Sequence, residues 1–280
     1  MQWSELELLH ADNVSFNYGE RPVLRGVSVT VPRGGLLGIL GPNGAGKTTF
    51  LQLLAGMSTP STGQVTFDGM DISKIDRSHL ARRMAIVPQE TSLTFDYTVL
   101  EVALMGRHPH LRTFEIEGPI DLKITREALA ATGTIELENR TFRSLSGGEK
   151  QRVIIASALA QFEQASQERL HFDKNQASTV LLLDEPTTSL DLHYQLALGT
   201  ILKKLNRERK ITIVISTHDL NFAATLCQEL VLLRDGRTIA VGRTEQILTS
   251  ESVRKLYDVD AAVQFHEASG HVTVVPLDKN

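Results

Sequence analysis

A glycine-rich segment of the sequence has the spacing G-x-x-x-x-G-K-[ST]; it reads Gly41-Pro42-Asn43-Gly44-Ala45-Gly46-Lys47-Thr48. It lies between the apolar run Leu36–Leu40 and a helical pattern over residues 48–54. In such a loop the backbone N–H groups converge on phosphate oxygens, at the positive end of the following helix. We expect Lys47 to reach the β- and γ-phosphates of a nucleotide and the Thr48 hydroxyl to bind Mg²⁺. The alternative is a glycine-rich turn with a chance Lys-Thr pair, and the flanking strand and helix patterns disfavour it.

A second apolar run, residues 180–183, ends in two acids, Asp184 and Glu185. An acid at the carboxyl end of a buried strand beside a phosphate loop can hold Mg²⁺, and we predict this role for Asp184. Glu185 is then placed to orient or deprotonate an attacking water. The alternative is that both acids cap the next helix. The phosphate loop upstream disfavours that interpretation.

A third motif reads Leu145-Ser146-Gly147-Gly148-Glu149-Lys150-Gln151. Ser146 and Glu149 have the S-x-x-E spacing of a capping box, so the segment has a purely structural interpretation as the start of a helix. However, glycines inside a helix cost about 1 kcal/mol each relative to alanine, and a cap does not require them. Close approach of the backbone to a phosphate does require them, so we expect a second phosphate contact here.

With these three motifs in this order, the chain resembles an ABC-transporter ATP-binding subunit over nearly its full length. The resemblance adds Tyr18 as the aromatic that stacks on adenine, Gln89 as the glutamine loop and His218 as the switch histidine. It also identifies Ser189-Leu190-Asp191 as the D-loop. One departure is Glu149-Lys150-Gln151, because the commonest form of the family has glutamine directly after the two glycines. That position usually tolerates Glu.

The resemblance implies the following site. The predicted ATP-binding residues are Tyr18, Gly41, Pro42, Asn43, Gly44, Ala45, Gly46, Lys47, Thr48 and Thr49. The predicted catalytic residues are Glu185, His218 and Gln89, and the predicted Mg²⁺ ligands are Thr48, Gln89 and Asp184. The predicted signature residues are Ser146, Gly147, Gly148 and Glu149, and the D-loop residues are Ser189 and Asp191.

For two of these residues the residue type alone favours a structural role. An aromatic in a strand such as Tyr18 is usually core, and a histidine such as His218 commonly caps a helix that starts nearby. Their place in the order of motifs favours adenine stacking and contact with the γ-phosphate instead.

The family also implies a head-to-tail dimer, in which each ATP lies between one phosphate loop and the Ser146-Gly147-Gly148 segment of a second copy. The implied cofactors are ATP and Mg²⁺. The implied partners are that second copy, integral-membrane permease subunits and a substrate-binding protein.

Strand-like and helical patterns alternate along the chain, which predicts an α/β fold with a sheet layered by helices. Expected strands are 6–18, 23–31, Leu36–Leu40, 64–67, 70–72, Met84–Val87, 180–183, 211–216, 230–234 and 238–241. Expected helices are 48–54, 99–106 (opened by a Thr98–Glu101 capping box), 124–133, 150–159, 192–206 and 220–227. Asp68-Gly69 and Asp235-Gly236 predict tight hairpin turns.

The predicted fold class is therefore α/β. The resemblance specifies a P-loop NTPase (RecA-like) core with an N-terminal antiparallel β subdomain and an inserted α-helical lobe. We expect one ABC ATPase domain over 1–280, with its core in 1–90 and 162–250 and the lobe in 91–161. Residues 251–280 are expected to form an accessory segment in which 263–276 makes two strands. Residues 161–179 are polar and predict a surface excursion.

Several stretches resemble the subgroup that serves importers of iron chelates, haem and cobalamin. They are the segments 106–110, 192–196 and 218–221. An iron complex, siderophore or haem, is the first expectation for the cargo and cobalamin the second. After Gln89, the side chains of Phe95, Tyr97, Leu104 and Met105 are candidates for an apolar contact with the membrane subunits, although such residues are often core. His108 and His110 are more typical of surface residues than of metal ligands.

Composition restricts the function classes. The formal charge of −4 argues against nucleic acid as a partner, and one cysteine, Cys227, fits a reducing compartment. No secretory signal is visible and no apolar run approaches the roughly twenty residues of a membrane helix, so we expect a soluble subunit, peripheral at the cytoplasmic face of the cell membrane.

Three rival classes remain. A non-transport ABC ATPase usually carries a long coiled coil or two ATPase units, whereas this sequence predicts a short helical lobe and one unit. A non-enzymatic nucleotide-binding switch is expected to lack Glu185 or His218, and both are present. An exporter remains possible from the motifs alone, although bacterial exporters often fuse a membrane segment to this domain.

Overall fold

Six strands form the central sheet, in the order β10-β9-β3-β8-β7-β6. The computed structural model describes residues 7–91, 93–163, 178–188, 190–267 and 270–277. The strands are β3 (Leu36–Leu40), β6 (Met84–Val87), β7 (Val180–Asp184), β8 (Thr212–Thr217), β9 (Glu229–Arg234) and β10 (Arg237–Arg243). Neighbours from β9 to β6 run parallel, and β10 returns antiparallel through the predicted Asp235-Gly236 turn. Strands covered on both faces need apolar side chains in succession, which explains why β3, β7 and β8 are buried throughout.

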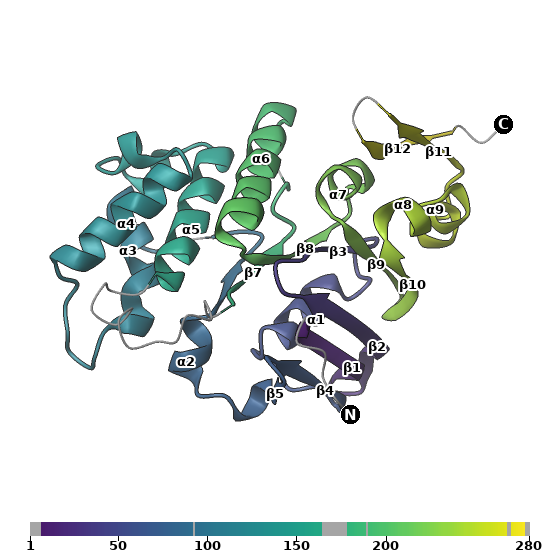
Figure 1. Ribbon diagram of the computed structural model, residues 1–280, viewed down its shortest axis with the longest axis horizontal. Helices are drawn as coiled ribbons and strands as arrows, with labels where there is room; N and C mark the ends of the chain where they lie inside the picture. Colours follow the sequence, from purple (N-terminus) through teal and green to yellow (C-terminus); the bar gives the residue numbers. More distant parts are fainter. Residues whose placement is uncertain (1–6, 92, 164–177, 189, 268–269, 278–280) are drawn as a thin grey trace.

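A second sheet of four antiparallel strands has the order β2-β1-β4-β5. Its strands are β1 (Glu7–Tyr18), β2 (Arg21–Pro32), β4 (Thr62–Phe67) and β5 (Met70–Asp71). The Asp68-Gly69 hairpin is confirmed, but the strand after it ends at Asp71 because Ile72 begins a short 3₁₀ turn. This sheet packs with α1 (Lys47–Leu54) against one face of the central sheet, so α1 lies between the two sheets (Figure 1).

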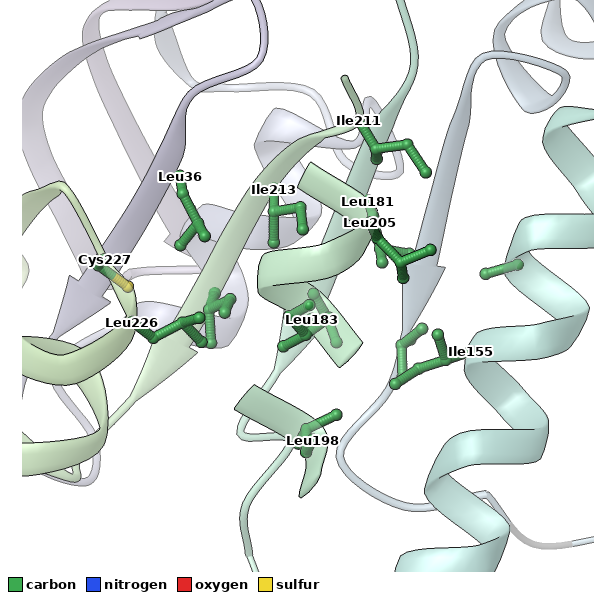
Figure 2. Packing of buried hydrophobic residues seen from close by; sticks show 14 of the residues in the cluster. Leu36, Ile155, Leu181, Leu183, Leu198, Leu205, Ile211, Ile213, Leu226 and Cys227 are labelled. Atoms are coloured by element: carbon green, nitrogen blue, oxygen red, sulfur yellow. The ribbon is translucent and has the colours of Figure 1, made fainter. Parts of the chain in front are cut away.

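The central sheet separates two hydrophobic clusters. Leu181 and Leu183 of β7 belong to one cluster, and Leu182 belongs to the other. This follows from the strand geometry, because successive side chains point to opposite faces. Figure 2 shows Leu198 and Leu205 of α6 (Leu192–Arg209) beside the first group, between the sheet and the helical lobe. β7 is therefore packed against apolar side chains on both faces up to the point where Asp184 and Glu185 follow.

The predicted helical lobe is confirmed, with α3 (Val99–Leu104), α4 (Pro119–Ala131) and α5 (Gly147–Phe162) on one side of the molecule (Figure 1). The Thr98–Glu101 capping box opens α3 as predicted, but the helix ends at Leu104 and a 3₁₀ turn, Met105–His110, follows it. Arg107 in that turn is 1% exposed. Its guanidinium contacts the Asp121 carboxylate at 2.8 Å and the carbonyl of Ala160 at 2.6 Å, which joins the turn to α4 and α5.

The C-terminal part contains two helices that the sequence patterns did not predict, α8 (Thr244–Ile247) and α9 (Ser250–Tyr257). Another short helix, α2 (Arg77–Ala81), was also missed. The two predicted strands of the tail are present as β11 (Ala261–His266) and β12 (His271–Pro276), which pair antiparallel. Most of the polar excursion, residues 164–177, lies outside the described residues. Among the helices that the structure describes, none is both long and apolar enough to cross a membrane.

Candidate nucleotide site

Four neighbouring parallel strands each end at one of the predicted motifs. Along the sheet order β3-β8-β7-β6, the phosphate loop follows β3, His218 follows β8, Asp184 ends β7 with Glu185 directly after it, and Gln89 follows β6. The carboxyl ends of parallel strands meet at one edge of a sheet, which is where open α/β sheets bind ligands. Motifs up to 177 positions apart (Gly41 and His218) are thereby brought to one place.

The phosphate loop has the backbone geometry that its glycines allow. Gly46 has φ of 99°, in the left-handed region, and it is the residue before the first turn of α1. Lys47 begins the helix and is 6% exposed. Its ammonium group donates to the carbonyls of Gly41 at 2.8 Å and Pro42 at 3.1 Å, so the side chain lies back over the loop. Thr49, in contrast, is buried on the core side and does not line the cavity described below.

The predicted magnesium ligands Thr48 and Asp184 are in contact. The Thr48 hydroxyl donates to the Asp184 carboxylate at 3.1 Å, and the hydroxyl of Ser216 in β8 donates to the same carboxylate oxygen. Hydroxyl and carboxylate oxygens are the donors that Mg²⁺ prefers. Both side chains therefore suit the predicted ion.

Glu185 lies between two basic groups. Its carboxylate contacts the Lys47 ammonium at 2.9 Å and the Nδ1 of His218 at 2.7 Å, while the carboxylate is largely buried and the His218 ring is about half exposed. Its backbone N–H donates to the carbonyl of Ser216 at 3.0 Å. Glu185 also has φ of 45°, a conformation that costs a non-glycine residue about 1–3 kcal/mol and tends to occur at functional sites.

These groups surround one cavity of about 360 Å³. Its lining residues are Asn43, Gly44, Lys47, Thr48, Gln89, Glu185, Thr188 and His218. Thr188 was not predicted, although it follows the acidic pair by three positions and that closeness is a signal for it. A larger cavity, of about 440 Å³, lies at the opposite ends of β3 and β9 beside Gly35 and Gln228 and contains none of the predicted site residues.

Tyr18 lies outside this lining. It is in the hairpin between β1 and β2, 55% exposed, with its ring edge-on to Phe16 at 4.9 Å between centroids. The same hairpin touches the phosphate loop, because a Cβ built on Gly46 would lie 3.1 Å from the carbonyl oxygen of Val23. Because the Tyr18 ring is exposed on a hairpin that touches the loop, it is accessible for the predicted stacking on adenine.

The signature segment also lies outside the cavity. Ser146 and Glu149 form the predicted capping box: the Ser146 N–H donates to the Glu149 carboxylate at 2.8 Å, and the Glu149 N–H donates to the Ser146 hydroxyl at 3.3 Å. This hydrogen bond from the Ser146 backbone is the main cause of the lowered pKa of Glu149. Glutamine, which the family more often has at this position, can close the same capping box, so Glu149 preserves the local structure.

Gly148 has a packing reason that the sequence did not reveal. A Cβ on this residue would lie 2.5 Å from the ring of Tyr194 in α6, so only glycine fits. The D-loop residue Asp191 caps the same helix by accepting from the Tyr194 N–H at 3.1 Å, whereas Ser189 lies outside the described residues. The D-loop and the signature are thus adjacent through Tyr194.

The sequence and the structure of this chain are similar to those of known proteins. A family model described as ABC transporter matches residues 24–165. The chain belongs to the ABC transporter family. It carries the ATP-binding domain, and the motifs described above are those by which it resembles that family.

Curated relatives cover most of the chain. It is 39% identical over 91% of its length to the cobalamin import ATP-binding protein BtuD of Halobacterium salinarum, and spans 60% of that relative. It is 36% identical over 95% of its length to the hemin import ATP-binding protein HmuV of Methylobacillus flagellatus, and covers 93% of it. It is 34% identical over 97% of its length to the ferric enterobactin transport ATP-binding protein FepC of Escherichia coli, and covers 94% of it.

Solved structures of the family have the same fold. One is a metal-chelate type ABC transporter in an inward-facing conformation, with a TM-score of 0.81 and 30% identity over 97% of this chain and 98% of that one. Another is the dimeric ABC transporter cassette MJ0796, with a TM-score of 0.70 and 28% identity over 85% of this chain and 99% of that one.

Proposed function

We propose that this chain is the ATP-hydrolysing subunit that powers import of an iron complex, a siderophore or haem, through a separate membrane permease. The observation that carries the ATPase part is the convergence of Lys47, Glu185 and His218 on one cavity at the carboxyl edge of the sheet. Asp184 is hydrogen-bonded to Thr48, which also lines this cavity. A nucleotide-binding switch without turnover needs neither a buried carboxylate nor a histidine beside it.

The hydrolytic step follows from these side chains. Glu185 accepts a proton from the water whose oxygen attacks the γ-phosphorus, and the bond to the bridging oxygen breaks to release ADP and phosphate. His218 holds Glu185 and the water in place from the other side. Thr48, Asp184 and Gln89 would hold Mg²⁺, which supplies positive charge to the phosphate oxygens when bound.

The working unit is a head-to-tail dimer. The cavity of one chain includes none of Ser146, Gly147, Gly148 and Glu149, so the second phosphate contact has to come from another copy. The signature stands at the N-terminus of α5, a helix of 16 residues whose first N–H groups can bind an anion. The cassette MJ0796, solved as a dimer, supports a dimeric working unit.

The proposed cargo rests on the relatives. Two of the three named above handle hemin and ferric enterobactin, both iron complexes, and cobalamin import is the alternative because of the BtuD relative. The permease contact is proposed beside Gln89. Of the apolar residues considered there, Phe95 is 67% exposed and available to a partner, whereas Tyr97 packs against the core. We further propose a substrate-binding protein as the third component and the cytoplasmic membrane face as the location.

Reconstitution tests this proposal. The chain and its permease are placed in liposomes that enclose the substrate-binding protein together with a ferric siderophore, haem or cobalamin. Phosphate release from ATP added outside is then measured. We expect an iron complex to stimulate hydrolysis and Glu185→Gln to abolish that stimulation. Stimulation by cobalamin alone would establish the alternative, and an inactive parent protein would overturn the ATPase assignment.

A further inference from the structure

The C-terminal part of the chain contacts the segment that carries His218. Tyr257 is the last residue of α9, and its hydroxyl donates to the backbone carbonyl of His218 at 3.0 Å. Figure 1 shows α9 and the β11–β12 hairpin on the same side of the molecule as α7 (Leu220–Leu226), the helix that follows the switch histidine. The two segments are almost forty positions apart in the sequence, so no local pattern links them.

The Tyr257 hydroxyl is held in its donor form. A carbonyl oxygen can only accept a hydrogen bond, so the phenol has to keep its proton. Burial raises the pKa of Tyr257, and the nearby negative charges of Glu185 and Asp219 raise it further. The contact therefore persists throughout the neutral range.

A second contact holds the chain just after His218, at Asn221. Asn221 exchanges two hydrogen bonds with β12: its amide nitrogen donates to the Val274 carbonyl at 3.1 Å, and the Val274 N–H donates to its amide oxygen at 2.8 Å. The carboxylate of Asp219, between His218 and Asn221 in the chain, caps α7 through the N–H groups of Asn221 and Phe222. The short segment from His218 to Asn221 is thus held at both ends by the C-terminal part.

The C-terminal part is itself anchored to the sheet. Arg234, the last residue of β9, donates to the Lys255 carbonyl at 2.5 Å and pairs with the Asp258 carboxylate at 2.5 Å. Directly after Arg234, the Asp235-Gly236 turn reaches the phosphate loop, because the Gly236 N–H donates to the Ala45 carbonyl at 3.2 Å. The C-terminal part is therefore connected by hydrogen bonds, through Arg234 and the turn after it, to the phosphate loop as well as to the segment from His218 to Asn221.

We propose that Tyr257 is a positioning residue for ATP hydrolysis, whose hydroxyl holds the backbone of His218 so that the imidazole stays in contact with Glu185. The inference deepens the proposed function and rests on it. His218 Nδ1 lies 2.7 Å from the Glu185 carboxylate, while the imidazole is half exposed. A half-exposed side chain has little packing to fix it, so its place depends on its backbone and hence on Tyr257.

Tyr257→Phe tests the inference, because it removes only the hydroxyl and keeps the ring packed against the core. Loss of one hydrogen bond corresponds to roughly a fivefold effect, which we expect in kcat with KM for ATP unchanged. The matched control is Glu251→Gln, which removes an exposed ion pair with Lys255 on the same helix and has no contact with His218. Its kcat is expected to equal that of the parent.

The second readout follows His218 itself. The chain has nine histidines, so its imidazole signal is assigned in ¹³C-histidine NMR spectra by its loss in His218→Gln. Tyr257→Phe is expected to change the chemical shift of this signal, because the ring moves relative to Glu185, and to leave the other histidine signals unchanged. Asn221→Ala, which releases the switch from β12 without altering Tyr257, is expected to shift the same signal.

Each outcome is decisive. A parental kcat in Tyr257→Phe, or an unchanged His218 signal, overturns the positioning role. A fall in kcat that is accompanied by a lower melting temperature, without any change in the His218 signal, would give Tyr257 a packing role only. That outcome also overturns the positioning role. If the parent protein has no turnover that Glu185→Gln removes, the proposed function fails, and the NMR comparison still decides whether Tyr257 positions His218.

Discussion

Replacing Glu185 by glutamine separates the chemistry of the site from its shape. Glutamine has the same length and can occupy the same pocket, but it carries no charge and cannot accept a proton from water. In the structure the Glu185 carboxylate contacts Lys47 at 2.9 Å and His218 at 2.7 Å, in largely buried surroundings. The substitution therefore removes the proposed general base and a buried ion pair in one step.

The loss of the base is expected to lower turnover, and the loss of the ion pair is expected to strengthen ATP binding. Removing a positioned general base lowers turnover by about 10²- to 10⁴-fold. The ion pair has the reverse effect on binding, because the carboxylate competes with the γ-phosphate of ATP for the Lys47 ammonium. A hydrogen bond to a charged group contributes about 1.5–3 kcal/mol, so ATP is expected to bind roughly ten- to a hundredfold more tightly to Glu185→Gln than to the parent.

Two assays measure these effects. Phosphate release gives turnover, and titration with a fluorescent ATP analogue gives affinity. Size-exclusion chromatography in ATP is expected to show the variant accumulating as a dimer, because bound nucleotide is no longer consumed. Glu185→Asp is the matched control: it keeps the charge but shortens the side chain, so turnover falls while affinity for ATP stays nearer the parental value.

The reasoning fails in two distinct ways. Normal hydrolysis by Glu185→Gln would refute the assignment of the general base. Weaker binding of ATP than in the parent would refute the competition between the carboxylate and the γ-phosphate for Lys47, whatever the effect on turnover.

Two further substitutions test how the fold supports the site. At Asp68, burial raises the pKa, but hydrogen bonds from two arginines, Arg83 foremost, outweigh it and hold the pKa below the usual 3.8. The carboxylate therefore stabilises the protein above that pH, and the gain is lost as the pH falls through the lowered pKa. Asp68→Asn should cost about 2 kcal/mol at pH 7 and progressively less as the pH falls below 3.8 in denaturant titrations, and a gap independent of pH would contradict this. Gly148→Ala should cost about 1–3 kcal/mol and reduce turnover, because its Cβ would lie 2.5 Å from the Tyr194 ring, whereas Gly199→Ala in α6 has room and should not destabilise; equal melting temperatures for the two variants would refute the packing argument.

The elements that the sequence predicts well are those specified by local chemistry. β3 and β7 read as apolar runs because both of their faces are buried. The Asp68-Gly69 and Asp235-Gly236 pairs predict hairpins because both residues of each pair adopt positive φ, which this turn requires. Each of these signals is contained within a few neighbouring residues.

The elements that were missed depend on packing between distant segments. α9 has only eight residues, and a helix of two turns is stable only where its apolar face is covered. Val253 and Leu256 supply that face, and Thr249 supplies a cap, so a weak signal existed. Nothing in the sequence, however, links Tyr257 to His218 or Tyr194 to Gly148, because each pair meets only after the chain has folded.

The order of strands explains why one group of motifs forms a single cavity and the signature does not. The phosphate loop, the acidic pair, His218 and Gln89 each lie at the carboxyl end of a strand or directly after it, and parallel strands bring these ends to one edge of the sheet. Ser146 follows no strand of the sheet; it starts α5 in the helical lobe, where it closes a capping box with Glu149. The hydrogen-bonded sheet fixes the first group, whereas the lobe is joined to the core by side-chain contacts, such as those of Gln161 in α5 with the carbonyls of Ala81 and Met84. A site divided in this way can form and open as two chains approach and separate, which is the property that a nucleotide-driven dimer needs.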